Sequence, residues 1–196
     1  MVGRPKTLNK DHALATALEG YWREGIYGMS VNEVCRRAKI SKPGLYREFG
    51  GEDGLLTAVL ERYEATVIDR IRRHLELEHS FTESMALFIG AFFANADQPQ
   101  GCLLAELRLA HSDLGEMTQA TVAKVVKAYQ AMFRAWLERR QALGEVSAQI
   151  ELDQATRYLD SQLMLAATQA QRGDNPKDIS ERFMMSLQAL TAPTPI

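Results

Sequence analysis

Apolar residues recur at intervals of three and four along most of this chain, which is the spacing of helices that bury one face. The first such stretch runs from about Asn9 to Arg23, two short stretches follow at 31–38 and 42–49, and a long one extends from Leu55 to Leu75. Later stretches cover 81–96, 102–111, 117–143, 153–172 and 178–190. The pattern predicts an all-α protein of about nine helices.

Residues with side-chain oxygens precede the first three helices. Asn9 has the character of an N-cap, and Ser30 and Glu33 have the spacing of a capping box, in which each side chain accepts the other residue's amide proton. Ser41 is the expected N-cap of the third helix, where Pro43 in the first turn breaks no helical hydrogen bond. The second helix should therefore begin at 31 and the third at 42.

The two faces of the third helix differ in chemistry. Leu45 and Phe49 are four residues apart and are expected in the core. A phenol, a proline and two cations lie on or beside the opposite face, close to a helix N-terminus that attracts phosphate; they are Lys42, Pro43, Tyr46 and Arg47. A short helix, a tight turn and a basic helix form the helix-turn-helix arrangement.

Composition agrees with this assignment. Alanine and leucine greatly outnumber valine and isoleucine, which favours helices over sheets. Residues 1–50 contain nine Lys or Arg and five Asp or Glu, a net charge of +4, whereas the remainder of the chain has a net charge of −6. The N-terminal part is therefore the expected site of contact with a polyanion.

Several other classes of protein are not indicated. The longest nearly apolar stretch, 85–96, is about half of the ~20 residues that a membrane span needs, and the basic N-terminus lacks the apolar segment of a signal peptide. We expect a cytoplasmic protein without a membrane segment. Two cysteines are too few for a disulfide framework, and His74 and Glu78, four apart, lack a third metal ligand. The sequence predicts neither a metal nor a cofactor.

Enzyme motifs are also missing from the sequence. It contains no G-x-S-x-G, Walker A, H-E-x-x-H or strand-associated G-x-G-x-x-G segment. A helical enzyme or adaptor without DNA binding is the alternative from a different functional class. It leaves the basic face of the third helix unexplained.

Residues 2–60 also carry a set of short motifs at consistent spacing. They are the basic segment at 3–6 (GRPK), the segment at 25–31 (GIYGMSV), Ala38-x-Ile40-Ser41, Gly44-Leu45-Tyr46-x-x-Phe49 and Leu55-Leu56. In these motifs the chain resembles the TetR family of bacterial transcription regulators.

The resemblance implies an N-terminal helix-turn-helix DNA-binding domain at 1–52. It also implies a helical domain at 53–196 that binds a small ligand and forms a homodimer through its last two helices, here 153–172 and 178–190. The implied function is a repressor that binds a palindromic operator in double-stranded DNA and is released by an unknown small-molecule effector. The sequence leaves open the effector, the operator, the regulated genes and the choice between repressor and activator.

Residue roles carried over from the family concern the third helix and the N-terminal segment. Base edges would be approached by Lys42, Pro43 and Gly44, phosphates would be held by Ser41, Tyr46 and Arg47, and Arg4 and Lys6 would reach the backbone or minor groove. The family usually has a phosphate-contacting lysine where this chain reads Gly51-Glu52-Asp53. Because acidic residues repel phosphate, some of the missing positive charge is expected from Lys39, Arg36 or Lys42. Lys39 also stands at a helix end that favours a left-handed backbone.

The second domain contains many aromatic and aliphatic residues that could line an effector cavity. The candidates are Phe88, Phe92, Leu104, Leu107, His111, Tyr129, Phe133, Trp136 and Gln162. Some relatives sense oxidants or electrophiles through cysteine, so a cysteine-based sensor of the same fold remains an alternative. For Cys102, which precedes an apolar helix, a buried thiol is the default interpretation.

Overall fold

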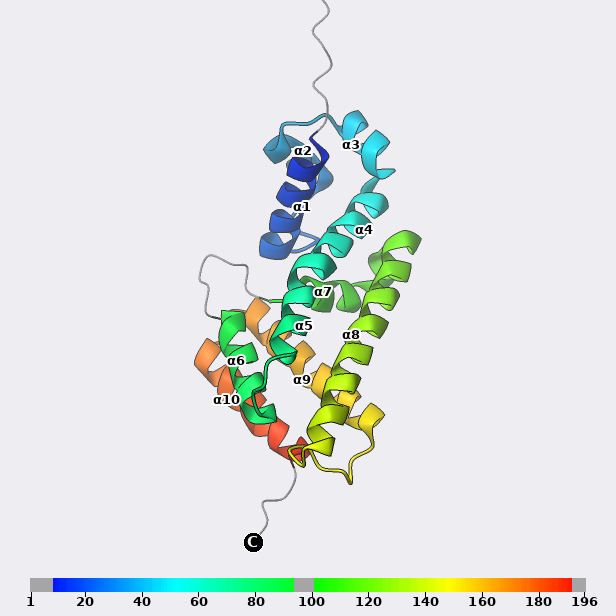
Figure 1. Cartoon of the computed structure of the whole chain (residues 1–196). Helices are drawn as coiled ribbons and strands as arrows, with labels where there is room; N and C mark the ends of the chain where they lie inside the picture. Colours follow the sequence, from blue (N-terminus) through cyan, green and yellow to red (C-terminus); the bar gives the residue numbers. More distant parts are fainter. Residues whose placement is uncertain (1–8, 94–100, 192–196) are drawn as a thin grey trace, which may run out of the picture.

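The computed structural model describes residues 9–93 and 101–191, which form α-helices joined by turns (Figure 1). The helices are α1 (Lys10–Glu24), α2 (Val31–Ala38), α3 (Lys42–Phe49), α4 (Glu52–Tyr63), α5 (Asp69–Leu75), α6 (Phe81–Phe93), α7 (Leu103–Leu109), α8 (Glu116–Ala142), α9 (Leu152–Gln171) and α10 (Pro176–Leu187). A π-helical segment, Glu64–Ile68, joins α4 to α5 without a break. Counted with α4 and α5 as one rod, the described part of the chain has nine helices, which confirms the all-α prediction.

Helix α1 and the helix-turn-helix pair α2 and α3 begin at the predicted caps. The side-chain oxygen of Asn9 accepts from His12 N at 3.0 Å, Ser30 Oγ accepts from Glu33 N at 3.2 Å, and Ser41 Oγ accepts from Gly44 N at 3.2 Å. These hydrogen bonds satisfy amide groups that the first turn leaves without helical partners.

One half of the predicted capping box is wrong. The carboxylate of Glu33 does not return to the Ser30 amide but accepts hydrogen bonds from Arg36 and Arg37 on the same helix. Guanidinium groups three and four residues away are within reach of a helical glutamate and form charge-assisted hydrogen bonds.

Helix α4 connects the N-terminal three helices to the rest of the molecule. It packs against both α1 and α8, and its continuation into α5 runs down the second unit (Figure 1). Leu45 and Phe49 of α3 are buried, as predicted, and Leu55, Val59 and Leu60 of α4 are completely buried. The N-terminal unit is therefore held against a helix that belongs to both cores.

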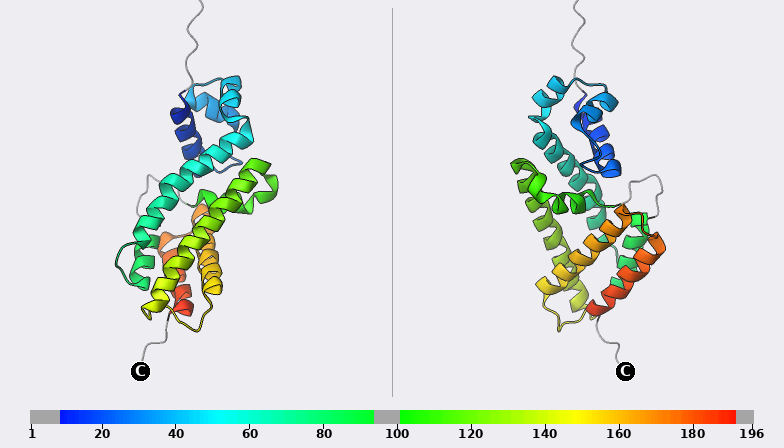
Figure 2. Two further views of the ribbon diagram at one scale, coloured as in Figure 1. Left: turned by 45° about the vertical axis from the view of Figure 1, so that its right-hand side comes forward. Right: turned by 180° about the vertical axis from the view of Figure 1, so that it is seen from behind.

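The second unit is a bundle of α5 to α10. Trp136 of α8 is completely buried and stacks on Phe81 of α6 with ring centroids 5.4 Å apart. Helices α9 and α10 pack together and lie side by side on one face, as the rear view in Figure 2 shows. Within 9–93 and 101–191, no helix combines the length and apolar character of a membrane span. The predicted extension of α6 to 96 lies outside the described residues.

Candidate functional site

The outer face of α3 presents basic and polar side chains to solvent. We call the exposed residues Ser41, Lys42, Pro43, Tyr46 and Arg47 the α3 face. Gly44 does not belong to it, because this residue is buried on the inner side of the helix. The arrangement follows from the sequence, since Leu45 and Phe49 fix which side of a two-turn helix points inward.

Three side chains at one end of the α3 face contact one another. The ammonium of Lys42 lies 5.3 Å from the ring centroid of Tyr46 and 3.9 Å from a carboxylate oxygen of Glu52, at the start of α4. The Tyr46 hydroxyl donates to Glu52 Oε1 at 3.1 Å. Glu52 therefore occupies two groups that could otherwise contact a phosphate. The sequence predicts repulsion at this position but not these contacts.

Lys39 ends α2 in the left-handed conformation that its position predicts. Its φ of 55° and ψ of 43° make it the single non-glycine among the described residues with a positive φ. Such a backbone costs a residue with a Cβ about 1–2 kcal/mol. The sharp reversal at Lys39 directs the chain from α2 into α3, and its side chain is exposed beside the turn.

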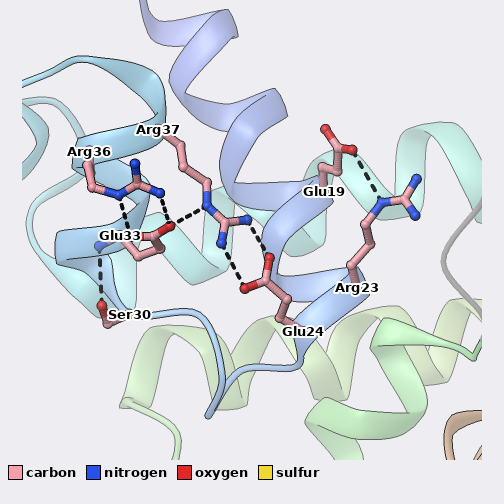
Figure 3. Close-up of polar contacts among 7 residues, drawn as sticks. All are labelled: Glu19, Arg23, Glu24, Ser30, Glu33, Arg36 and Arg37. Carbon is pink, nitrogen blue, oxygen red and sulfur yellow. Dashed lines mark hydrogen bonds and ion pairs between the residues drawn. The ribbon is translucent and has the colours of Figure 1, made fainter.

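A network of ion pairs joins α1 to α2 (Figure 3). Arg36 donates to both oxygens of Glu33, at 2.8 and 2.6 Å, and Arg37 donates to Glu33 at 2.6 Å and to Glu24 of α1 at 2.9 Å. Hydrogen bonds from Arg36 and then Arg37 lower the pKa of Glu33 to about 2. Glu19 and Arg23 form a separate pair on α1.

The network changes the prediction for Arg36. Its side chain is 72% exposed, so it is accessible to DNA, but its guanidinium already pairs with Glu33. The four charges of Glu24, Glu33, Arg36 and Arg37 cancel, which weakens the field available to a phosphate. The other two predicted DNA contacts outside α3 and the turn, Arg4 and Lys6, lie outside the described residues.

A cavity of about 260 Å³ lies in the second unit, among α4 to α9. Four of the predicted effector residues line it, namely Phe88, Phe92, Leu104 and Tyr129. Five do not: Leu107, Phe133 and Trp136 are buried elsewhere in the core, Gln162 is partly exposed on α9, and His111 is exposed in a turn. Periodicity identifies an inward face but cannot tell which inward residues meet an empty space.

Other cavity residues come from elements that the sequence did not connect. Trp22 reaches the cavity from α1, and Tyr63 and His74 reach it from the continuous rod of α4 and α5. Asp160 is a buried acid within the apolar pattern of α9, and this unusual position could have indicated a polar group in the cavity wall. Among the described residues no group of three or more His, Cys, Asp or Glu could hold a metal ion.

Two polar groups of the cavity wall, the Asp160 carboxylate and the Cys102 thiol, accept hydrogen bonds from neighbouring side chains. Arg108 donates to the two oxygens of Asp160 at 2.7 and 2.9 Å, and Gln130 donates to Asp160 at 2.9 Å. The Tyr63 hydroxyl donates to the Sγ of Cys102 at 3.2 Å. Burial is the main reason that the pKa of the Cys102 thiol is raised above its ordinary value.

Helix α7 connects this cavity to the turn between α1 and α2. Leu104 and Arg108 face the cavity, whereas Glu106 of the same helix accepts the Ile26 amide proton at 2.7 Å. The Tyr27 hydroxyl in that turn also donates to Asp113, which follows α7. A displacement of α7 would therefore move groups that hold the N-terminal unit in place.

Asp53 of α4 forms a second connection by capping α8. Its carboxylate accepts from Met117 N at 2.9 Å, from Thr118 N at 3.0 Å and from the Thr118 hydroxyl at 2.6 Å. Burial acts to raise the pKa of Asp53, but the hydrogen bonds from Thr118 and Met117 outweigh it and lower the pKa below its ordinary value. The ionised carboxylate therefore stabilises the junction of α4 and α8.

Asp53→Ala is expected to lower the free energy of unfolding at pH 7 by about 1–2 kcal/mol, the usual cost of losing a helix cap. Because the folded pKa is depressed, this contribution is present above the unfolded pKa of about 3.9 and is lost as the pH falls through the folded value. Urea unfolding at pH 7 and pH 3 measures both effects. Glu116→Ala, an exposed acid in the first turn of α8, is the control. An equal loss for both variants would contradict the capping role.

Comparisons with known proteins agree with this geometry. Residues 13–59 match the family described as bacterial regulatory proteins, tetR family. The HTH-type transcriptional repressor ComR of Escherichia coli (strain K12) is 28% identical over 184 residues, which cover 87% of this chain and 83% of ComR.

Solved structures show the same fold. The reduced form of E. coli NemR has a TM-score of 0.80 and 21% identity, covering 95% of this chain and 98% of that one. A cysteine mutant of the TetR family transcriptional regulator CifR, complexed with 26bp double-strand operator DNA, has a TM-score of 0.77 and 23% identity. That match covers 96% of this chain and 100% of the CifR chain.

Proposed function

Because this chain belongs to the TetR family of bacterial regulatory proteins, we infer that it regulates transcription by binding DNA. The observation that carries this inference is the α3 face, whose basic and polar residues are exposed. Helix α3 itself lies near one end of the molecule (Figure 1). Lys42 and Pro43 would approach base edges, and Ser41, Tyr46 and Arg47 would hold phosphates. Such a regulator works in the cytoplasm, where bacterial DNA lies.

A homodimer would place two α3 faces on one DNA duplex. Helices α9 and α10 lie together on one face (Figure 2). Leu165 of α9 is 52% exposed and Met185 of α10 is 64% exposed. Apolar side chains on such a face favour burial against a second copy. Two-fold symmetry then requires a palindromic operator, with α3 helices about 34–36 Å apart if the half-sites are one turn apart.

The cavity would receive a small effector whose binding releases the DNA. The chain would then be a repressor, as the name of its relative ComR states for that protein. An effector that moves α7 would act on the α1–α2 turn through Glu106 and on α4 through the shared core. Linkage requires DNA to weaken effector binding by the same factor, with a typical coupling of about 1–3 kcal/mol.

Gel-shift measurements on the DNA upstream of the chain's own gene test the function. Binding should fall steeply as salt rises, because each phosphate contact releases condensed counterions. An enzyme or adaptor would give no shift at low salt. A shift with no salt dependence would exclude the α3 face as the binding surface.

Cys102 supports a second candidate, a regulator that senses oxidants, because the thiol lines the cavity and accepts a hydrogen bond from Tyr63. Its raised pKa opposes that function, since the thiolate is the reactive form. We therefore expect micromolar hydrogen peroxide to change DNA affinity less than about twofold. A reversible loss of binding that Cys102→Ser abolishes would favour the sensor instead.

A further inference from the structure

We propose that the cavity binds an uncharged, mostly apolar molecule with one hydrogen-bond acceptor, which the Tyr129 hydroxyl and the Arg108 guanidinium hold. The regulatory meaning of this binding rests on the proposed function, whereas the binding itself does not. Most of the cavity wall is apolar, so an apolar ligand fits it best. The apolar wall residues include Trp22, Ile71, Phe88, Phe92, Leu104 and Met164. A volume of about 260 Å³ is at the small end of ligand pockets, so the ligand is smaller than a typical drug molecule.

The charges inside the cavity exclude a charged ligand. Arg108 and Asp160 form a two-point ion pair, and Asp160 is 6% exposed. Gln130 supplies a third hydrogen bond to Asp160. A ligand with a net charge would lose its hydration without gaining a free counter-ion, which is unfavourable in a buried site. Arg70, a further cation of the wall, is exposed to solvent, where water and salt screen its charge.

Two hydrogen-bond donors of the cavity wall are not fully used, and they favour a ligand that carries an acceptor. Tyr129 is 8% exposed and packs edge-on against Phe133 with centroids 4.8 Å apart, yet its hydroxyl makes no hydrogen bond with any described residue. Arg108 has five N–H groups, of which Asp160 takes two. Because no described residue takes the Tyr129 donor, a ligand acceptor placed beside it would gain a hydrogen bond.

Three probes of similar size test the proposal on the full chain: 2-acetylnaphthalene, 2-ethylnaphthalene and 2-naphthoate. In calorimetric titrations the ketone should bind most tightly, the hydrocarbon about fivefold more weakly for lack of one hydrogen bond, and the carboxylate at least about tenfold more weakly. Tightest binding by the carboxylate, or no binding by the ketone, would overturn the proposal.

The variant Tyr129→Phe keeps the ring and removes the hydroxyl. It should weaken the ketone about fivefold and leave the hydrocarbon unchanged. Tyr158→Phe is the matched control, because the Tyr158 hydroxyl donates to the Ser186 carbonyl outside the cavity. Equal weakening of ketone and hydrocarbon by Tyr129→Phe would mean a packing effect and refute the assigned contact.

Gel shifts without any probe separate the two proposals. If the chain binds DNA but the ketone does not bind the chain, the regulator function stands and the ligand assignment falls. If the probe pattern holds but no DNA is bound, the ligand assignment stands and the regulator function falls.

Discussion

The double variant Leu165→Glu, Met185→Glu is expected to be a folded monomer that binds operator DNA about 10²–10⁴ times more weakly than the natural chain. Leu165 of α9 and Met185 of α10 are each more than half exposed, so their replacement costs the isolated subunit little. Charges buried between two copies would instead oppose association. Because one α3 face then contacts one half-site, the gain from simultaneous binding is lost.

Sedimentation velocity and anisotropy titrations with the operator measure this prediction. Leu77→Glu is the control, because Leu77 is 49% exposed and belongs to the turn after α5 rather than to α9 or α10. It should leave both the dimer and the affinity unchanged. A double variant that remains dimeric would contradict the proposed interface, and a monomer with full operator affinity would contradict paired half-sites.

Lys42→Ala and Glu52→Gln are expected to change DNA affinity in opposite directions, although the two side chains are only 3.9 Å apart. Loss of Lys42 removes a base-edge contact and should cost about 1–3 kcal/mol with a change in sequence preference. Loss of the Glu52 charge removes repulsion of a phosphate and weakens the competing hydrogen bond from the Tyr46 hydroxyl, since an amide oxygen is a weaker acceptor than a carboxylate. A like charge near 4 Å in water is worth about 1 kcal/mol, so binding should tighten about fivefold.

The same titrations at two salt concentrations separate these contributions. The benefit of Glu52→Gln should shrink at high salt, where exposed charges are screened. Glu138→Gln is the matched control, since the Glu138 side chain is 62% exposed and that of Glu52 is 64% exposed. Equal weakening on all sequences by Lys42→Ala would remove its base-reading role, and weaker binding by Glu52→Gln would show that its contacts with Lys42 and Tyr46 serve the bound state.

Local chemistry explains why the helix-turn-helix was predictable. The capping oxygens of Ser30 and Ser41 and the apolar pair Leu45 and Phe49 act within a few residues of their own helices, so tertiary packing does not change their outcome. Glu33 is the exception. Its spacing suits a capping box equally well, but two nearby guanidinium groups offer it stronger hydrogen bonds than one backbone amide.

The cavity depends on tertiary packing and was predictable only in part. Phe88, Phe92, Leu104 and Tyr129 line it, but the same pattern also placed Trp136 there, which instead fills the core against α6. A 3.6-residue period reports burial and not the gap between three or more helices. Pairings such as Arg108 with Asp160, 52 positions apart, leave no local signal.

Selection of bound duplexes from a random DNA pool tests the central claim most directly, because it asks whether the outward side of α3 reads sequence. An inverted repeat with half-sites in successive major grooves should be enriched, and Lys42→Ala should alter the enriched sequence. A pool that shows no enriched sequence at low salt, or the same enriched sequence after the α3 face has been replaced by alanine, would contradict the claim.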